Sequence, residues 1–369
     1  MAGSIWGTIF RITTWGESHG KGVGVTIDGC PAGLSLCQED IQKYLDRRKP
    51  GQSPFTTARK EEDQVEILSG VFEGKTTGTP IGLMVRNRDQ KSRDYHDIMD
   101  VYRPGHADYC FDAKYGFRDY RGGGRSSGRE TIGRVAAGAV ACKLLAVYGI
   151  QVNAYTKSIG EIEIDSQRFD LKVRDENRLY MPDAVAAREA SAYLEDLIRE
   201  QDSAGGVVEC VIQGVPAGVG EPVFDKLDAC LAKAIMSIGA VKGFEVGDGF
   251  GAARSRGSVN NDCFYVDSSG KVKKKTNHSG GILGGISDGS DIVFRAAFKP
   301  TPSIAQNQET VNRAGENVEI VVKGRHDPIV VPRAVVVVEA MAALTVADLL
   351  LMGKSSKLEG FMLSESGMG

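Results

Sequence analysis

The chain has 369 residues, of which 41% are hydrophobic and 25% charged, as in an ordinary globular protein. Fibrous and disordered classes are thereby excluded, and this length predicts two subdomains or a duplicated fold. Its 45 Lys and Arg against 48 Asp and Glu give a net charge of −3, which argues against a dedicated nucleic-acid-binding protein. The 46 Gly predict many tight turns and backbone-lined pockets.

The cysteines indicate whether the protein holds a metal, and the apolar segments indicate where in the cell it is found. The seven Cys form no CxxC pair and no pairing with His at zinc spacing, so reduced thiols and no metal site are expected. The N-terminus lacks the basic start and apolar run of a signal peptide, and no uncharged apolar stretch is long enough to span a bilayer. We therefore expect a cytoplasmic protein without membrane or nucleic-acid partners.

The N-terminal part of the chain predicts strands and one helix. A Gly-rich loop between the first two strands contains His19, which predicts an accessible imidazole. An amphipathic helix at residues 38–47 leads into a charge run of Arg47, Arg48 and Lys49. Such a run is usually solvated surface, and that interpretation stays open beside anion binding. Strands are predicted at residues 5–14, 23–28, 64–72 and 81–86.

Residues 103–134 carry seven Lys or Arg against four Asp or Glu, in a chain of negative net charge. Three consecutive glycines allow close backbone approach to a bound group, and Ser127 followed by Glu130 predicts a capping box that opens a helix. With Arg125 and Arg129 beside it, the helix start is predicted to bind phosphate or another compact anion. The alternative is a solvated basic turn before an ordinary helix.

A strand, a CPAG turn and a helix at residues 23–47 recur as a strand, a VPAG turn and a helix at residues 207–236. The offset of 185 residues is half the chain, which predicts a duplicated unit whose two copies pack together. The second helix is expected to have Pro222 in its first turn and Phe224 on its apolar face. Further helices are predicted at residues 131–148, 184–200 and 334–351, and strands at residues 291–298 and 318–323.

Six motifs follow one another over most of the chain. They are GESHG at 16–20, RPGHAD at 103–108, RGGGRSSGRET at 121–131, NHSGGILGGIS at 277–287, KPTPSI at 299–304 and GRHDP at 324–328. Together they closely resemble the chorismate synthases. The resemblance implies a carbon–oxygen lyase of the shikimate pathway (EC 4.2.3.5), which converts 5-enolpyruvylshikimate 3-phosphate into chorismate and phosphate. That reaction is an anti 1,4-elimination without net redox change that nonetheless requires reduced FMN.

The resemblance also implies an architecture and an assembly. The fold would be α+β, a duplicated β-α-β sandwich with helices packed between two mainly antiparallel sheets. A single domain would span residues 1–369, with similar halves at about 5–150 and 200–350. The family further implies a homotetramer.

The same resemblance implies which residues contact the ligands. Arg48, Arg129 and His19 would face the substrate phosphate or the neighbouring carboxylates. Where the family usually has a basic residue and an Asn, this chain has Pro54 and Gly239; Pro54 weakens the case for NADPH as the reductant, and Gly239 removes a side-chain hydrogen bond to the flavin. FMN would contact Arg125, Ser126, Ser127, Gly239, Ala240, Gly284, Lys299, Pro300, Thr301, Pro302, Ser303 and Arg325.

The elimination reaction calls for proton donors and a proton acceptor, and His19, His106 and Asp327 are the candidates. Loss of phosphate calls for an imidazolium that neutralises it, which His19 can supply, and His106 would protonate the reduced flavin. Asp327 would accept the proton that the flavin N5 removes from the ring. A structural His106 and an Asp327 engaged in a plain ion pair stay as alternatives. A flavin-dependent oxidoreductase and a non-catalytic phosphate-binding module are the rival classes of function.

Overall fold

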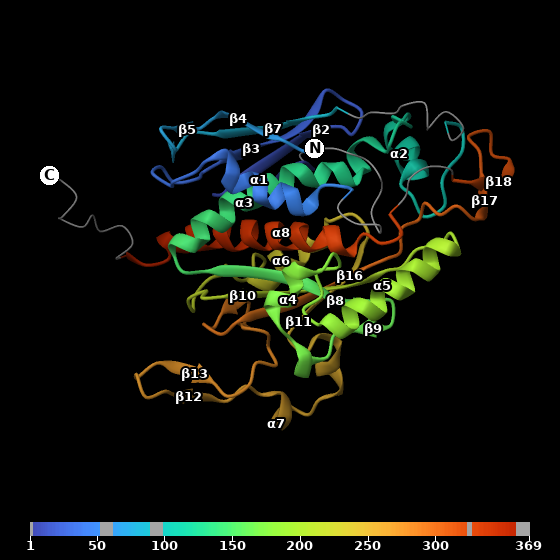
Figure 1. Ribbon diagram of the computed structural model, residues 1–369. Helices are drawn as coiled ribbons and strands as arrows, with labels where there is room; N and C mark the ends of the chain where they lie inside the picture. The colour runs from blue at the N-terminus through green and yellow to red at the C-terminus, as the bar shows by residue number, and fades with distance from the viewer. Residues whose placement is uncertain (1–2, 52–61, 89–98, 323–326, 359–369) are drawn as a thin grey trace.

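Two five-stranded antiparallel sheets face each other across a layer of helices (Figure 1). This computed structural model describes residues 3–51, 62–88, 99–322 and 327–358. The first sheet has the order β1-β2-β3-β7-β4 and the second the order β11-β16-β10-β8-β9. The first comprises β1 Ile5–Trp6, β2 Arg11–Gly16, β3 Gly22–Asp28, β4 Val65–Ser69 and β7 Ile81–Arg86. The second comprises β8 Gln151–Ile159, β9 Ile162–Glu163, β10 Gly206–Gln213, β11 Val241–Val246 and β16 Ile292–Phe298.

Helices fill the space between the sheets, and smaller elements lie around them (Figure 1). The inner helices are α1 Gln38–Arg48, α3 Thr131–Val147, α6 Leu227–Met236 and α8 Val331–Met352. The outer helices are α2 Asp108–Tyr115, α4 Leu171–Glu176, α5 Ala184–Arg199 and α7 Gly257–Asn260. The short strand pairs are β5 Val71–Phe72 with β6 Lys75–Thr76, β12 Phe264–Val266 with β13 Val272–Lys274, β14 Ile282–Leu283 with β15 Ile286–Ser287, and β17 Asn307–Val311 with β18 Asn317–Val321.

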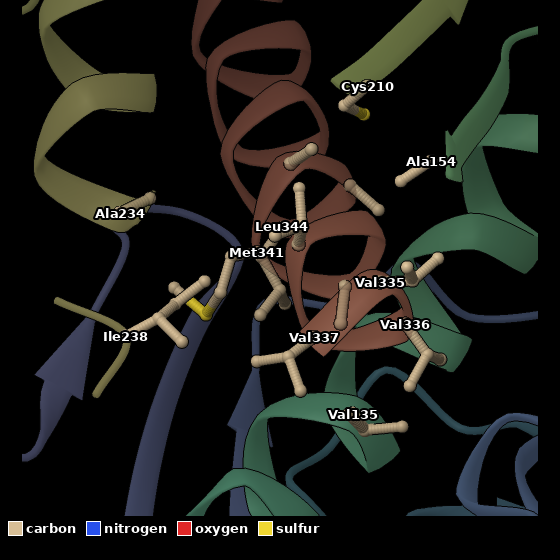
Figure 2. Packing of buried hydrophobic residues seen from close by; sticks show 14 of the residues in the cluster. Val135, Ala154, Cys210, Ala234, Ile238, Val335, Val336, Val337, Met341 and Leu344 are labelled. Carbon is tan, nitrogen blue, oxygen red and sulfur yellow. The ribbon is translucent and has the colours of Figure 1, made fainter. Parts of the chain in front are cut away.

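The centre of the core is α8. Figure 2 shows its side chains between residues of neighbouring elements, with Val135 of α3 on one side and Ala234 of α6 on another. By length and composition the helix from Val331 to Ser355 could cross a membrane, but 89% of its most apolar window is buried inside the protein. A helix that is apolar all round needs such cover on every side, so α8 is a core helix here.

The predicted architecture is confirmed, because helices lie between two antiparallel sheets. In each of the two sheets the central strand, β3 or β10, leads through a turn into an inner helix, α1 or α6. β8 follows the first predicted half directly and belongs to the second sheet. The division into two similar halves stays a prediction.

Two local predictions are wrong. α6 begins only at Leu227, and Phe224 is 90% exposed instead of lying on its apolar face. The segment before α3 is a short 3-10 turn, in which the Ser127 hydroxyl accepts from the Arg129 amide. The Glu130 carboxylate accepts from Thr14 and pairs with Arg134, so the reciprocal half of the capping box is replaced by tertiary contacts.

Candidate active site

A turn of glycines lies between the two histidines expected to be catalytic. Gly122 and Gly123 have φ angles of 68° and 85°, the left-handed region that favours glycine. A methyl group on Gly122 would come within 2.3 Å of Cε1 of His19, and one on Gly123 within 3.2 Å of Cε1 of His106. The turn thus packs against both rings, and the structure brings His19 and His106 together around it.

His19 lies in the loop between β2 and β3 and is only 8% exposed. Its Nδ1 is 3.1 Å from the Ser18 hydroxyl. The prediction of an accessible imidazole is therefore wrong, because Gly122 from a distant segment covers the ring. A ring held in one orientation can deliver a proton to one defined place, which suits a general acid.

His106 lies in the loop before α2, beside a buried ion pair. Its Nδ1 is 3.0 Å from Oδ1 of Asp108, and the guanidinium of Arg103 contacts both carboxylate oxygens of Asp108 at 2.8 Å. Burial alone would raise the pKa of Asp108, but the hydrogen bonds from Arg103 and His106 hold it well below its usual range. The Asp108 carboxylate and Nη2 of Arg103, each 3.0 Å from Nδ1, thus fix the orientation of the His106 ring.

The two arginines expected to bind substrate share one carboxylate. Asp63 places Oδ2 at 2.7 Å from Arg48 and Oδ1 at 3.0 Å from Arg129, and the three side chains are almost completely buried. We call Arg48, Asp63 and Arg129 the Asp63 cluster. Arg48 also donates to the carbonyl of Gly128 at 3.1 Å and the hydroxyl of Thr131 at 3.3 Å, which ties it to the start of α3.

The Asp63 cluster carries more positive than negative charge. Burial lowers the pKa of Arg48 to about 10, with contributions from Arg333 and Arg129 that oppose the attraction of Asp63. Burial would raise the pKa of Asp63, but Arg48 and Arg129 lower it. The solvated-surface interpretation is therefore wrong for Arg48. Lys49 is half-exposed and pairs with Asp46 at 2.9 Å.

Asp327 is joined to the same cluster through α8. Its Oδ2 is 2.5 Å from Nη1 of Arg333, and Nε of Arg333 donates to the backbone carbonyl of Arg48 at 3.0 Å. One guanidinium thus holds both the end of α1 and the carboxylate expected to accept a proton. The alternative of an Asp327 in an ion pair is therefore met by Arg333, while Arg325 lies outside the described residues.

The segment before α3 is held in place by its own side chains. Arg125 donates to the backbone of Gly16 at 3.0 Å and to the Thr14 hydroxyl at 2.7 Å, so its guanidinium fastens the segment to β2. Ser126 donates to the carbonyl of Gly123 at 2.7 Å. These contacts shape the turn that lies between the histidines.

The segment after β16 approaches the His106 loop. Nζ of Lys299 donates to the carbonyl of Gly105 at 2.6 Å, and the Lys299 amide donates to Ala240 at 2.9 Å. A methyl group on Gly105 would lie 3.0 Å from Cβ of Pro302. Ser203 binds the carbonyl of Thr301 at 2.8 Å. Ala240, Lys299 and the residues after it therefore lie beside the candidate proton donor.

Several features here fit a bound FMN. The buried hydroxyl of Thr301 has no hydrogen-bond partner in the described part of the chain, where a polar ligand would supply one. Lys299 has no carboxylate partner among the described residues, and burial lowers its pKa. A Cβ built on Gly239 would meet nothing within 4 Å. Pro300 packs near Gly205, and Ser303 is buried.

Gly284 is placed apart from this group. It lies in the β14–β15 hairpin, whose Gly281 packs against Ile292 at the start of β16. Lys299 follows the other end of that seven-residue strand. At about 3.3 Å per residue the two ends of β16 are roughly 20 Å apart, and the hairpin adjoins one end while Lys299 follows the other. Arg325 and Pro54 lie outside the residues that the structure describes.

Sequence reasoning missed Asp63, Asp108 and Arg333, as well as Asn87, which accepts from Nε of Arg129. Asp108 could have been found, because it follows His106 by two residues within the RPGHAD motif. Asp63 and Arg333 carry no local signal, since their partners belong to other elements. An Asn directly after a strand is likewise typical of an ordinary turn.

Buried arginines, two histidines around a glycine turn and a carboxylate define an enzyme that binds an anionic substrate and transfers protons. The family model for chorismate synthase matches residues 10–351, so the chain belongs to the chorismate synthase family.

Relatives support the assignment over nearly the full length. The chain is 66% identical to the chorismate synthase of Agathobacter rectalis over 97% of this chain and 98% of that protein. It is 56% identical to the Synechocystis chorismate synthase over 95% and 97%. A crystal structure of a chorismate synthase matches with a TM-score of 0.76 at 33% identity, covering 95% of this chain and 94% of the other.

The chain accordingly has chorismate synthase activity (EC 4.2.3.5), that of an FMN-dependent lyase of the shikimate pathway. The family is one of soluble enzymes that use reduced FMN.

Proposed function

We propose that Arg48 and Arg129 bind the phosphate and carboxylates of 5-enolpyruvylshikimate 3-phosphate, and that His19 and His106 act as general acids. Asp327 acts as the proton acceptor. One observation carries this proposal: a single short segment, residues 122–129, contains Arg129 and contacts His19, His106 and Arg48. Gly122 packs against His19, Gly123 packs against His106, and Gly128 accepts from Arg48.

Each residue has a defined task in this scheme. His19 neutralises the phosphate as the carbon–oxygen bond breaks, because a protonated imidazole beside a leaving anion lowers its charge. His106, fixed by Asp108, holds a proton next to the cofactor. Arg48 and Arg129 orient the substrate through charge-assisted hydrogen bonds. Asp327 takes up a proton and stays oriented by Arg333.

The cofactor site would comprise Lys299, Pro300, Thr301, Pro302 and Ser303 with Gly239 and Ala240, together with Arg125, Ser126, Ser127 and Arg325. Reduced FMN, when bound, supplies the electron density that eases phosphate loss. Lys299 offers a cation for its phosphate, and Thr301 a hydroxyl that lacks a partner among the described residues. NADPH is the candidate reductant, although Pro54 argues against direct binding. Anaerobic incubation with NADPH and FMN tests this, since a protein that reduces its own flavin consumes NADPH.

We further propose a homotetramer in the cytoplasm. Phe224, Phe250 and Phe264 are 90%, 83% and 57% exposed, and burial of such large apolar side chains on association would be favourable. In an assembly Gly284, whose hairpin adjoins the end of β16 opposite to Lys299, would complete the site of a neighbouring copy. Light scattering should then give about four times the mass of the 39.6 kDa chain. A monomer would dismiss both points.

The histidine roles are tested by single turnover under anaerobic conditions, with dithionite-reduced FMN and substrate. His19→Ala and His106→Ala should each slow chorismate and phosphate formation by roughly 10²- to 10⁴-fold, the usual effect of removing a general acid. His278→Ala is the matched control, because His278 also pairs with a carboxylate, at 2.8 Å from Asp248, on another part of the protein. A histidine variant that keeps the control's rate has only a structural role.

Asp327→Asn tests the proton acceptor separately. The amide keeps size and hydrogen bonding, yet it cannot take up a proton, so the single-turnover rate should fall by about 10²-fold or more while the substrate dissociation constant is retained. Titration of substrate into the FMN-loaded protein gives that constant. A normal rate with weakened binding would make Asp327 a structural partner of Arg333.

A further inference from the structure

Asn87, directly after β7, connects two parts of the candidate site. Its side-chain amide donates to the carbonyl of Glu17 at 3.0 Å and to that of Gly20 at 2.8 Å. Its side-chain oxygen accepts from Nε of Arg129. The backbone amide of Asn87 also donates to the carbonyl of Lys21 at 3.1 Å. One half-buried side chain thus contacts both the histidine loop and a substrate arginine.

The two carbonyls that Asn87 contacts are the ends of the turn that carries His19. Within this turn the Gly20 amide donates to the Glu17 carbonyl at 3.1 Å, so the backbone closes on itself around His19. Asn87 fastens both ends of the turn from outside, while Gly122 packs against the ring from the other segment. The place of the imidazole therefore depends on the Asn87 amide.

We propose that Asn87 is a positioning residue that fixes His19 relative to Arg129 and acts on the reaction through His19. The inference rests on the roles proposed above for His19 and Arg129. Only an amide side chain offers two N–H groups for carbonyls and one oxygen for a guanidinium at the same time. Because a misplacement of about 1 Å can cost about 10²-fold in rate, loosening this turn should affect the chemical step.

Two substitutions separate the contacts of Asn87. Asn87→Asp keeps an acceptor for Arg129 but loses both donors to the turn, whereas Asn87→Ala loses all three contacts. The kcat with dithionite-reduced FMN and 5-enolpyruvylshikimate 3-phosphate should fall in both variants, by about 10- to 100-fold. The KM should rise further in Asn87→Ala, because only there does Nε of Arg129 lose its side-chain acceptor at position 87, whereas the pair of Arg129 with Asp63 is kept in both variants.

The matched control is Asn177→Asp. Asn177 likewise donates to two backbone carbonyls, those of Val173 at 2.7 Å and Met181 at 2.8 Å, in the connection between α4 and α5. If loss of such a clamp merely destabilises the protein, both Asp variants lower the urea midpoint and neither changes the kcat of folded enzyme. A positioning role predicts a lower kcat for the Asn87 variant alone.

A double-mutant cycle with His19→Ala makes the test decisive. If Asn87 acts through His19, adding Asn87→Asp to His19→Ala should leave the residual kcat unchanged. Full additivity, or a kcat within about threefold of wild type in the single Asn87 variants, would overturn the inference. Should Asn87→Asp fail to fold, the same cycle is run with Asn87→Ala. If His19→Ala itself keeps full activity, the proposed role of His19 has failed, which is a distinguishable result.

Discussion

Arg47 and Arg48 are neighbours at the end of α1, and both meet a buried carboxylate, yet their surroundings differ in charge. Arg47 contacts Glu339 of α8 at 2.6 and 3.1 Å, and Glu339 also lies 3.5 Å from Arg174 and accepts from the amide of Ala154. Arg174 has a second partner in Asp175 at 2.9 Å. Two guanidiniums and two carboxylates therefore balance in this group, which we call the Glu339 cluster.

The Asp63 cluster with its neighbours is unbalanced. Arg48, Arg129 and Arg333 bring three guanidiniums against the carboxylates of Asp63 and Asp327. The pKa values reflect this difference: burial lowers the pKa of Arg48 to about 10, whereas Glu339 outweighs burial and raises the pKa of Arg47 above its ordinary value. A buried surplus of positive charge is costly unless an anion arrives, so the unbalanced cluster is the one suited to binding.

The largest effect should come from breaking the balanced cluster. Glu339→Gln leaves Arg47 and Arg174 without their shared charge in the core, and breaking a buried pair in this way costs about 3 to 5 kcal/mol of unfolding free energy. Urea unfolding measures that loss. The kcat of the folded fraction should stay close to wild type, because Glu339 contacts none of the groups proposed to bind substrate. A variant with wild-type stability would show that the cluster is not structural.

The sequence could place Arg47 and Arg48 at the end of one helix, but it could not separate their roles. Successive residues on a helix point about 100° apart, so the two side chains had to face different neighbours. Those neighbours, Glu339 and Asp63, lie 292 and 15 residues away. No local pattern identifies such partners, and the resemblance to the family alone singled out Arg48.

The lack of a local signal for tertiary contacts also explains which of the other sequence predictions were right and which were wrong. Helices with clear periodicity were predicted to within a few residues of α1, α3, α5 and α8, because the spacing of apolar residues in the local sequence shows which face is buried. The burial of His19 was not predicted, because Gly122, which covers its ring, belongs to a segment distant in the sequence. The start of α6 was also misjudged, since a Pro and a Phe before Leu227 imitate a helix start that the fold does not use.

The second-largest effect concerns substrate affinity, which should depend on the arginines of the Asp63 cluster and not on those of the Glu339 cluster. Arg129→Ala should weaken substrate binding by about 1.5 to 3 kcal/mol, the worth of a charge-assisted hydrogen bond. Arg47→Ala is the control, because it removes a carboxylate-paired arginine of the balanced cluster, partly buried where Arg129 is buried, and should leave the affinity of the folded protein unchanged. Titration of substrate into FMN-loaded protein measures both. Equal affinities for the two variants would remove Arg129 from the binding site.

The smallest effect concerns pH and isolates the charge of Asp63. Burial would raise the pKa of Asp63, but Arg48 and Arg129 hold it below its ordinary value. A carboxyl with a lowered folded-state pKa contributes stability that is fully present above its unfolded pKa of about 4 and is lost as the pH falls through the folded pKa. Asp63→Asn lacks this contribution at every pH.

The difference in unfolding free energy between wild type and Asp63→Asn should therefore be constant from pH 7 to about 4.5 and shrink below that, by at most about 1.4 kcal/mol per pH unit because one proton is involved. Urea unfolding of both proteins across this range provides the measurement, and other titrating groups cancel in the difference. A gap that stays constant at low pH would mean that Asp63 stabilises the site by shape and hydrogen bonding alone. The pairs of Asp63 with Arg48 and Arg129 would then contribute no stability that depends on the charge of Asp63, and the comparison with the ion-paired Glu339 cluster would lose its electrostatic basis.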